Sequence, residues 1–332
     1  MQGAAVRPCN WWHRLAADSP PGVIQALQVR RALPPGPPFA DNLRIALVAE
    51  GGAMRGVVAG GMVSAIERLG FTDCFDLMVG SSAGACALAY LRAGQARFGT
   101  RIFYEDINNP RFISRARLLR GRRIADNDFL IDEVFRRIKP LDTDALARQG
   151  PELFATATDV DGARTELLSN FDDAASAMEI LRATSRMPLV SGGTVAFGGR
   201  RFLDGSMLMH IPIDAAIDLG ATHILVILTK PYAGSRPEGS DFVDRHILPK
   251  LLSLRYGRRL GAAARAAEDR YVEIRHMLNS ARPVTYRGAS VVAVAPSAGQ
   301  PEVPREERNA GRLKAAAADG DRQMAAILER RT

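Results

Sequence analysis

Short runs of apolar residues alternate along this chain with stretches in which apolar residues recur every three or four positions. The first pattern is typical of strands buried on both faces of a parallel sheet, and the second of amphipathic helices. The runs that predict strands are residues 44–49, 75–79, 152–158, 223–228 and 290–295. The stretches that predict helices are residues 57–69, 83–92, 172–184, 212–219 and 309–329. An ordered alternation of this kind is typical of α/β proteins.

Two hairpins are predicted within the alternation. Residues 164–168 have the pattern of a strand that turns back on 152–158. Residues 194–197 and 200–203 flank a Gly198-Gly199 pair, which favours a tight hairpin turn. The second hairpin delivers Asp204-Gly205-Ser206 at its end.

Changes in this pattern divide the chain into three predicted parts. Residues 1–42 form an N-terminal arm, and residues 43–231 contain most of the strand–helix alternation, with a helical and basic insertion that could cover a site. Residues 232–332 form a mostly helical extension with one added strand at 290–295. Within the arm we expect a Trp11-Trp12 pair docked on the domain, a short helix over 21–31 and a stiff proline-rich linker at 34–38.

Composition narrows the class of protein. Of the 332 residues 47% are apolar and 24% are charged, which is typical of a globular protein with a full core. No apolar run is as long as a membrane span, and residues 1–41 show no secretory signal pattern. The three cysteines (Cys9, Cys74 and Cys86) are odd in number and unpatterned, which indicates neither a disulfide framework nor a zinc site. We therefore expect a cytoplasmic protein.

The net charge of +8 raises the question of an acidic partner. Arginine is spread over the whole chain, and its densest cluster, between Arg111 and Arg123, has few interleaved aromatic residues. That pattern argues against a surface on which nucleic-acid bases stack, so we expect no nucleic-acid partner. Peripheral contact with an anionic membrane through lipid headgroups remains open.

Ser82 is the first candidate for chemistry. It lies at the centre of a G-x-S-x-G motif. The apolar run before the motif stops at Gly80, and an Ala-rich stretch that predicts a helix follows Ser82, with Gly84 in its first turn. In a nucleophile elbow the serine occupies a sharp strand-to-helix turn, where crowding requires small neighbours. The start of the helix adds N–H groups and a positive dipole end, which favour developing negative charge. The pattern predicts that Ser82 is a nucleophile.

A second glycine-rich turn joins the strand at 44–49 to the next helix, and reads Glu50-Gly51-Gly52-Ala53-Met54-Arg55-Gly56. A phosphate-binding loop would need Lys and then Ser or Thr after the last glycine, and a dinucleotide fingerprint needs G-x-G-x-x-G; neither is present. An oxyanion hole needs only N–H donors close to a nucleophile, so this function fits the loop best. Arg55 either braces the loop or forms a salt bridge at the start of the helix.

A serine hydroxyl needs a proton acceptor in order to attack a carbonyl. Each histidine after Ser82 lies in a context that favours a structural role: His210, His223, His246 and His276. Asp204 is the better partner, because it ends a hairpin strand, precedes Gly205 and has no Lys or Arg in the loop after it. A partly desolvated carboxylate has a raised pKa and is a competent general base.

With these three features in this order, the chain resembles the patatin-like phospholipases, in particular the bacterial branch whose first motif begins Glu-Gly-Gly. The resemblance covers about residues 43–231, which would be the catalytic domain, and includes Ser185-Arg186-Met187-Pro188 and residues 202–228. It implies a three-layer α/β/α sandwich with a largely parallel central sheet. It also implies a Ser82–Asp204 dyad that acts through an acyl-enzyme on a lipid or fatty-acyl ester.

The resemblance further assigns the oxyanion hole to the backbone of Gly51, Gly52 and Ala53, and requires no metal or cofactor. Two positions depart from the family pattern. Ala53 replaces the third glycine of the first motif, and a positive φ there would cost on the order of 1 kcal/mol. Ser206 replaces Gly or Ala, and its hydroxyl could compete for Asp204. A catalytically weak lipid- or membrane-binding protein on the same fold is therefore the alternative function.

Overall fold

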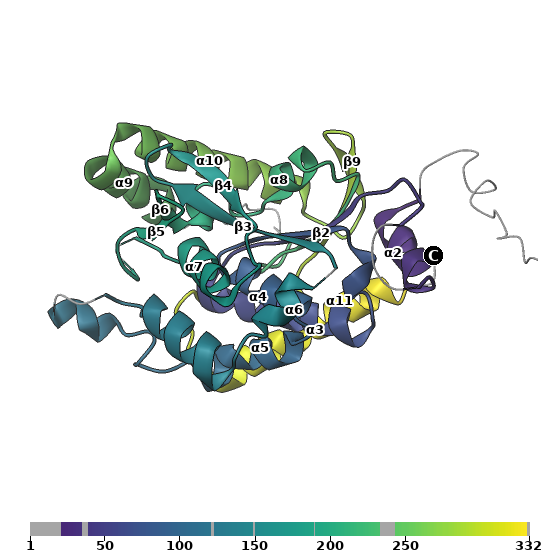
Figure 1. The fold of residues 1–332 in the computed structure, drawn as a ribbon, viewed down its shortest axis with the longest axis horizontal. Coiled ribbons are helices and arrows are strands. Elements are labelled where there is room, and N and C mark those ends of the chain that lie inside the picture. The colour runs from purple at the N-terminus through teal and green to yellow at the C-terminus, as the bar shows by residue number, and fades with distance from the viewer. Residues whose placement is uncertain are drawn as a thin grey trace, which may run out of the picture.

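The structure is a computed structural model, which describes residues 21–34, 39–120, 123–148, 150–188, 190–232 and 243–330. The predicted Trp11-Trp12 contact and most of the proline linker lie outside these residues. Within them, the strands form one nine-stranded sheet in the order β5-β6-β3-β2-β1-β7-β9-β8, with β4 paired to β3. Helices cover both faces of this sheet (Figure 1).

All of the strands except β8 lie where the sequence predicts them, within one or two residues. They are β1 (Ile45–Ala49), β2 (Leu77–Ser81), β3 (Glu152–Asp159), β4 (Arg164–Leu168), β5 (Val195–Phe197), β6 (Arg200–Asp204), β7 (His223–Ile227), β8 (Val284–Tyr286) and β9 (Ala289–Val294). The central pairs β3–β2, β2–β1, β1–β7 and β7–β9 are parallel, and the pairs at the margins are antiparallel.

The α-helices fill the two outer layers. They are α2 (Val23–Arg31), α3 (Gly56–Arg68), α4 (Ala83–Arg92), α5 (Ala96–Glu105), α6 (Thr143–Ala147), α7 (Ala174–Thr184), α8 (Ile213–Asp218), α9 (Leu248–Tyr256), α10 (Arg258–Met277) and α11 (Ala310–Leu328). Two π-helical segments, Phe129–Ile138 and Val243–Ile247, complete the longer helical regions. No helix in these described ranges combines the length and apolar character needed to cross a membrane.

The core explains why the central strands read as unbroken apolar runs. Ile45, Leu47 and Ala49 of β1 point into the cluster under α3, α4, α7 and α11. The alternate residues Ala46 and Val48 point into the cluster under α8 and α10. Because both faces of the strand are buried, every position is apolar. The three-layer α/β/α sandwich with a largely parallel sheet is therefore confirmed.

The segments on either side of residues 43–231 pack on the same sandwich. The buried Arg30 of α2 donates to the carboxylates of Asp41 and Asp76, both at 2.7 Å. At the other end of the chain, α11 packs along α3 and β9 pairs with β7. The C-terminal extension contributes two strands where the pattern predicts one, because the three-residue β8 turns into β9 through Arg287 and Gly288, both at positive φ. An edge strand this short carries little periodicity of its own.

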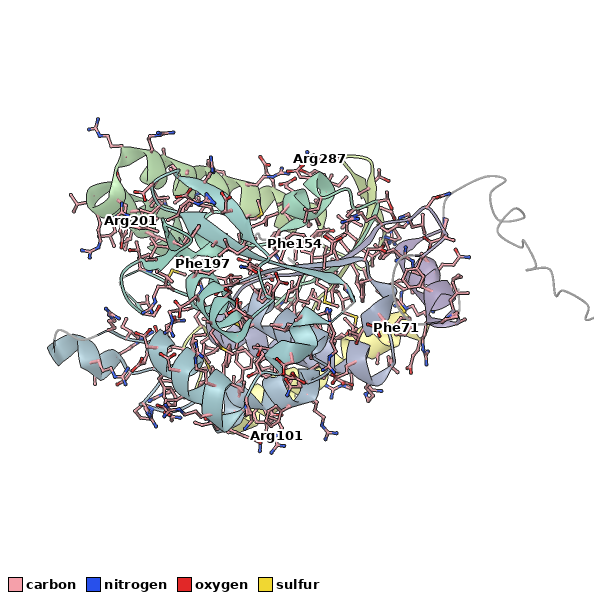
Figure 2. The ribbon with its side chains drawn as sticks, viewed as in Figure 1. Phe71, Arg101, Phe154, Phe197, Arg201 and Arg287 are labelled. Atoms are coloured by element: carbon pink, nitrogen blue, oxygen red, sulfur yellow. The ribbon has the colours of Figure 1, made fainter. Side chains whose placement is uncertain are left out.

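Figure 2 places Arg101 and Arg287 on opposite outer sides of the sandwich, with Phe154 between its layers. Phe154 packs against the cluster under α8 and α10. These two arginines thus lie on the outside, and the sheet is enclosed by apolar side chains, as burial of apolar surface requires.

Candidate active site

Ser82 lies on a sharp turn between β2 and α4. Its backbone has φ 52° and ψ −124°, a conformation that costs a non-glycine residue on the order of 1–3 kcal/mol. The two motif glycines allow this turn because the chain packs against itself on both sides. A Cβ on Gly80 would lie 2.5 Å from Cα of Ala85, and a Cβ on Gly84 would lie 2.6 Å from the carbonyl oxygen of Ala49. The turn therefore has the geometry of a nucleophile elbow.

The sheet brings Asp204 to the same place from 122 residues further along the chain. Strand β3 pairs with β4 along one edge, and its other edge is shared by β2 and β6. Ser81 at the end of β2 pairs with Thr156, and Asp204 at the end of β6 pairs with the next residue, Ala157. The two strands thus run toward each other along one edge of β3, and their last residues meet.

At this meeting point the hydroxyl of Ser82 donates a hydrogen bond of 2.8 Å to Oδ2 of Asp204. Both side chains are buried, with exposed fractions of 7% for Ser82 and 2% for Asp204. The other carboxylate oxygen, Oδ1, accepts from the backbone N–H of Ser206 at 2.8 Å and from its hydroxyl at 2.7 Å. Ser206 therefore does not compete with Ser82 for one oxygen, and it orients the carboxylate so that Oδ2 faces the serine.

Burial raises the pKa of the Asp204 carboxyl to about 6. The hydrogen bonds from Ser206 and Ser82 and the charge of Arg305 oppose this rise, since they stabilise the ionised form. At neutral pH the group is mostly ionised, yet it is a stronger base than an ordinary aspartate. These are the properties that a general base needs.

The last residue of α7 and the segment that follows it hold Ser82 and Asp204 in place. The side-chain oxygen Oγ1 of Thr184 accepts the N–H of Ser82 at 3.0 Å, and the carbonyl oxygen of Arg186 accepts the N–H of Asp204 at 2.9 Å. The guanidinium of Arg186 donates to Asp128 and to the carbonyl oxygen of Ser191, which fixes the segment. Thr184 belongs to no motif, so its role had no sequence signal beyond its place beside the Ser185–Pro188 run.

Gly205 and Gly56 are both explained by close approach. A Cβ on Gly205 would lie 2.2 Å from the carbonyl oxygen of Thr156, so only glycine lets the chain pass β3 directly after Asp204. A Cβ on Gly56 would lie 2.6 Å from that of Ala83 in the first turn of α4. Gly56 thus allows the glycine-rich loop after β1 to approach the elbow after β2.

In this loop the backbone N–H groups of Gly52 and Ala53 point to no acceptor within the described part of the chain, whereas that of Gly51 donates to the carbonyl oxygen of His210 at 3.3 Å. Gly51 itself lies against the elbow, since a Cβ there would be 3.2 Å from Cβ of Ser82. Of the three predicted residues, Gly52 and Ala53 are therefore the ones with N–H groups available to a substrate oxygen. Ala53 has φ 51°, so the positive φ that strains an alanine at this position is present.

Glu50, directly before the loop, is a buried anchor that the motif reading missed. Its carboxylate accepts from the N–H of Thr229 at 2.5 Å, from the Thr229 hydroxyl at 2.9 Å and from the Tyr271 hydroxyl of α10 at 2.9 Å. Burial raises the pKa of Glu50, but the nearby Arg275 and Arg55 and these donors outweigh burial and hold it below its usual range. The base of the loop is thereby tied to the C-terminal extension.

Arg55 forms an ion pair that links two distant segments of the chain. Its side chain is buried, and its guanidinium lies 3.4 Å from the carboxylate of Glu302 in the extension. Arg55 directly precedes α3, so this is an ion pair at the start of the helix, and because the partner is 247 residues away it also joins the loop to the extension.

The histidines have other contacts. Nε2 of His210 lies 3.2 Å from Oε1 of Glu268, and its ring stacks on Tyr271 with a centroid distance of 4.6 Å. The buried His223 contacts the Thr222 hydroxyl and the carbonyl oxygen of Pro21. The group that meets the serine hydroxyl is the carboxylate of Asp204.

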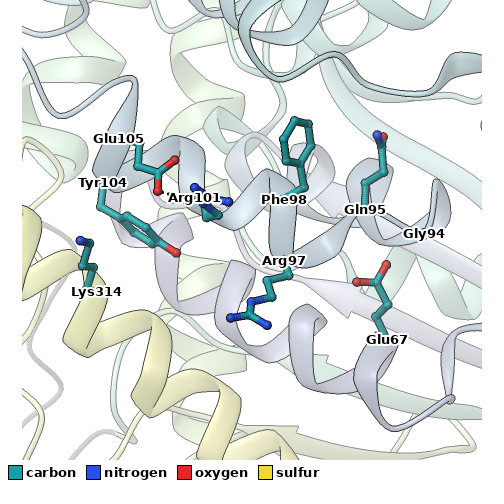
Figure 3. A pocket seen from close by; sticks show the side chains of 9 residues that line it. All are labelled: Glu67, Gly94, Gln95, Arg97, Phe98, Arg101, Tyr104, Glu105 and Lys314. Atoms are coloured by element: carbon teal, nitrogen blue, oxygen red, sulfur yellow. Dashed lines mark hydrogen bonds and ion pairs between the residues drawn. The ribbon is translucent and has the colours of Figure 1, made fainter.

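An open recess of about 690 Å³ lies elsewhere, on the outer side of α5 and α11 (Figure 3). Its basic residues, Arg97, Arg101 and Lys314, come from these two helices, and neither Ser82 nor Asp204 lines it. Arg101 is paired with Glu105 at 2.9 Å, and the Lys314 ammonium lies 5.6 Å from the ring centroid of Tyr104. This recess is thus separate from the Ser82–Asp204 site.

Comparison with known proteins agrees with the motifs. A family model described as Patatin-like phospholipase matches residues 47–217, just over half of the chain. The chain therefore belongs to the patatin-like phospholipase family. The uncharacterized protein YjjU of Escherichia coli (strain K12) is 30% identical over 199 residues, which cover 58% of this chain and 54% of that protein. The match thus spans about half the length of this relative.

Two solved structures are also similar. VipD from Legionella pneumophila has a TM-score of 0.46 at 13% identity, over 87% of this chain and 67% of that chain. Human GIVD cytosolic phospholipase A2, solved with a fluorophosphonate inhibitor, has a TM-score of 0.38 at 11% identity, over 92% of this chain and 61% of that chain. Both TM-scores lie below 0.5, so neither similarity bears on the activity of this chain.

Proposed function

We propose that this protein is a serine lipid acyl hydrolase, of the phospholipase or carboxylesterase type. The observation that carries the proposal is the 2.8 Å hydrogen bond from the Ser82 hydroxyl to Asp204, between a strained elbow and a buried carboxylate of raised pKa. Membership of the patatin-like phospholipase family supports lipid esters as the substrate class.

In the first half-reaction, Oγ of Ser82 attacks the carbonyl carbon of the ester while its proton passes to Oδ2 of Asp204. The carbonyl oxygen becomes an oxyanion, which the N–H groups of Gly52 and Ala53 and the N-terminal end of α4 stabilise. The tetrahedral intermediate then collapses, the ester C–O bond breaks, and the leaving alkoxide takes the proton from Asp204. An acyl-Ser82 ester and a free alcohol result.

In the second half-reaction, water attacks the acyl-Ser82 carbonyl and gives its proton to Asp204. Collapse of this second intermediate returns the proton to Oγ of Ser82 and releases the fatty acid. Every step needs Asp204 ionised when it accepts and protonated when it donates, and a pKa of about 6 allows both near neutral pH.

A second candidate, a lipid- or membrane-binding protein with little turnover, is favoured by Ala53. A left-handed φ of 51° at a residue with a Cβ strains the segment that would hold the oxyanion. Family membership is compatible with both candidates, so an experiment must separate them.

The test is covalent labelling of the purified protein with a fluorophosphonate probe, for wild type, Ser82→Ala and Asp204→Asn. We expect labelling of wild type, none of Ser82→Ala, and strongly slowed labelling of Asp204→Asn. Circular dichroism establishes that each variant is folded. Absence of label on folded wild type would contradict the hydrolase and favour the second candidate.

A further inference from the structure

Helix α9 has two apolar faces, and a helix on the surface of a globular protein ordinarily has one. The buried face includes Leu252, which packs in a cluster with Leu203 and Met207. The opposite face carries Leu251 and Leu254, which lie on the solvent side of the helix. The side chain of Leu254 is 87% exposed, so this face leaves apolar surface in water.

The exposed face is also strongly basic. Between residues 245 and 265 the chain has six arginines and lysines and no acidic residue: Arg245, Lys250, Arg255, Arg258, Arg259 and Arg265. Arg245 is 3.6 Å from Asp269. Among the residues that the structure describes, Lys250, Arg258 and Arg265 have no ion-pair partner.

These features meet in a hollow of about 610 Å³ between α9 and the start of α10. Lys250, Arg258 and Arg265 line it together with Leu254. The helices come close because α10 has Gly261 at the crossing, where a Cβ would lie 2.5 Å from the carbonyl oxygen of Pro249. The hollow therefore places three cations around an apolar patch on the outside of the molecule.

The arginine cluster that is densest in the sequence is different. Arg115 pairs with Glu306 at 2.5 Å, and the guanidinium of Arg111 lies 4.2 Å from the ring centroid of Phe129. Arg123 is 3.8 Å from Asp128. Arg115 and Arg123 thus each have a carboxylate partner and Arg111 an aromatic one, whereas the cations of the hollow have no ion-pair partner among the described residues.

The position of α9 connects this surface to the Ser82–Asp204 site. Leu203 directly precedes Asp204, and Met207 directly follows Ser206, and both contact the buried face of α9 through the shared cluster. In Figure 1, α9 lies on the same side of the molecule as β6, the strand that ends at Asp204, and its Leu252 shares a cluster with Leu203 of that strand. A partner that binds the outer face of α9 is therefore held one helix away from the residues that flank the carboxylate.

We infer that the outer face of α9 and the start of α10 dock on an anionic phospholipid membrane. Leu251 and Leu254 enter the interface, and Lys250, Arg258 and Arg265 contact the headgroup phosphates. The inference rests on the proposed function in one respect, because docking would bring a membrane that contains the substrate to the Ser82–Asp204 site. Membrane binding itself needs no turnover. A second copy of this chain is a poor occupant, because an isologous contact would bring Lys250, Arg258 and Arg265 of one copy against the same three cations of the other.

The experiment is co-sedimentation with vesicles of mixed phosphatidylglycerol and phosphatidylcholine, compared with phosphatidylcholine alone. We expect binding to the anionic vesicles, weakened by salt. Lys250→Gln/Arg258→Gln/Arg265→Gln lowers the affinity on the order of 10- to 100-fold. Leu251→Ser/Leu254→Ser lowers it roughly tenfold, since the apolar anchor is lost.

The matched control is Arg97→Gln/Arg101→Gln/Lys314→Gln in the recess of Figure 3, which removes the same charge from the opposite layer. We expect this variant to bind the vesicles as wild type does. If both triple variants lost vesicle affinity equally, the effect would depend on net charge alone, and the inference would be overturned. Failure of wild type to bind, or a dimer in light scattering that Leu254→Ser dissociates, would overturn it as well.

Hydrolysis of a monomeric short-chain ester, measured on the same samples, separates this inference from the proposed function. If both triple variants cleave the monomeric ester at the wild-type rate and only the α9–α10 variant fails on vesicles, both proposals hold. Vesicle binding without any ester cleavage by wild type would contradict the proposed function alone. Ester cleavage without vesicle binding would contradict the docking surface alone.

Discussion

Two strand-to-helix turns lie side by side in this protein, and each holds a non-glycine residue in left-handed backbone. Ser82 after β2 has φ 52°, and Ala53 after β1 has φ 51°. At Ser82 the flanking glycines touch backbone atoms, and a Cβ would come within 2.5–2.6 Å of them. At Ala53 the preceding Gly52 is crowded by side chains and not by backbone, since the nearest atoms to a Cβ are Cβ of Arg55 at 3.0 Å and Oγ1 of Thr229 at 3.1 Å.

The difference teaches how each turn is fixed. The elbow is held by contacts of the backbone with neighbours close in sequence or on the adjacent strand. The glycine-rich loop is held through the residue before it, Glu50, whose carboxylate accepts hydrogen bonds from Thr229 and from Tyr271 of α10. The packing that forces the first turn is therefore local or comes from the adjacent strand, with one hydrogen bond to the distant Thr184, whereas the second turn is held by parts of the chain about 180 to 220 residues away.

The largest effect is expected from breaking the elbow's chemistry. Ser82→Ala removes the nucleophile and Asp204→Asn removes the base, and each lowers kcat on a lipid ester by at least about 10³-fold. The double variant is no slower than Ser82→Ala, because the two groups act as a unit. Steady-state kinetics check this, and independent, additive losses would contradict the dyad.

Breaking the packing of the elbow comes next. Gly80→Ala places a Cβ against the backbone of Ala85 and destabilises the protein by about 3 kcal/mol. Gly193→Ala is the matched control, since a Cβ there meets nothing within 4 Å. Urea denaturation measures the free energy of unfolding of both variants. Equal values would show that the elbow can accommodate a Cβ at residue 80.

The support of the loop is tested by Tyr271→Phe. The change removes one hydrogen bond to the buried, ionised Glu50 and costs roughly 2 kcal/mol of stability. Because Glu50 directly precedes the loop, kcat also falls several-fold, while KM changes little. A loss of stability with unchanged kcat would mean that α10 stabilises the sandwich without positioning the loop.

The ionisation of Asp204 gives a smaller, reversible effect. Since its pKa is raised to about 6, lowering the pH through 6 protonates the base, and kcat/KM falls about tenfold per pH unit below it. Ser206→Ala removes a hydrogen bond that favours the ionised form, so the midpoint moves to higher pH. A midpoint near pH 4, or one unmoved by Ser206→Ala, would contradict this assignment.

Ala53→Gly has the smallest expected effect. Relief of the left-handed strain, about 1 kcal/mol, is largely offset by the greater freedom of glycine in the unfolded chain. Ala163→Gly is the control, because Ala163 has the same φ of 51° in a turn outside the loop. We expect the two variants to shift the thermal unfolding midpoint by similar amounts. If Ala53 positions an oxyanion donor, only Ala53→Gly also alters kcat.

Several features could be predicted from the sequence because they depend on local pattern. The apolar runs fix the strands, since residues buried on both faces must all be apolar. The glycine spacing around Ser82 indicates the elbow, and Asp204-Gly205 at the end of a hairpin marks the second residue. The family and the three-layer fold follow from these patterns in their order.

Other features could not be predicted, because they depend on which distant segments meet. The pattern gave no reason to expect that β2 and β6 share one edge of β3, which brings Ser82 to Asp204. Thr184 and Tyr271 have no distinguishing sequence signal, and their roles arise only from the neighbours that the fold supplies. Likewise, the sequence marked the arginines between residues 111 and 123 as the basic cluster, although Arg115 and Arg123 have carboxylate partners in the fold.

The sequence by itself thus determined most of the elements, their order and the choice of Ser82 and Asp204 as candidate site residues, because periodicity and glycine spacing act within a few residues. Tertiary structure decided how these two residues meet, the anchoring of the glycine-rich loop and the exposure of the α9 face. These depend on packing between segments far apart in the chain, where the energy of a side chain is set by its neighbours and not by its position in a pattern.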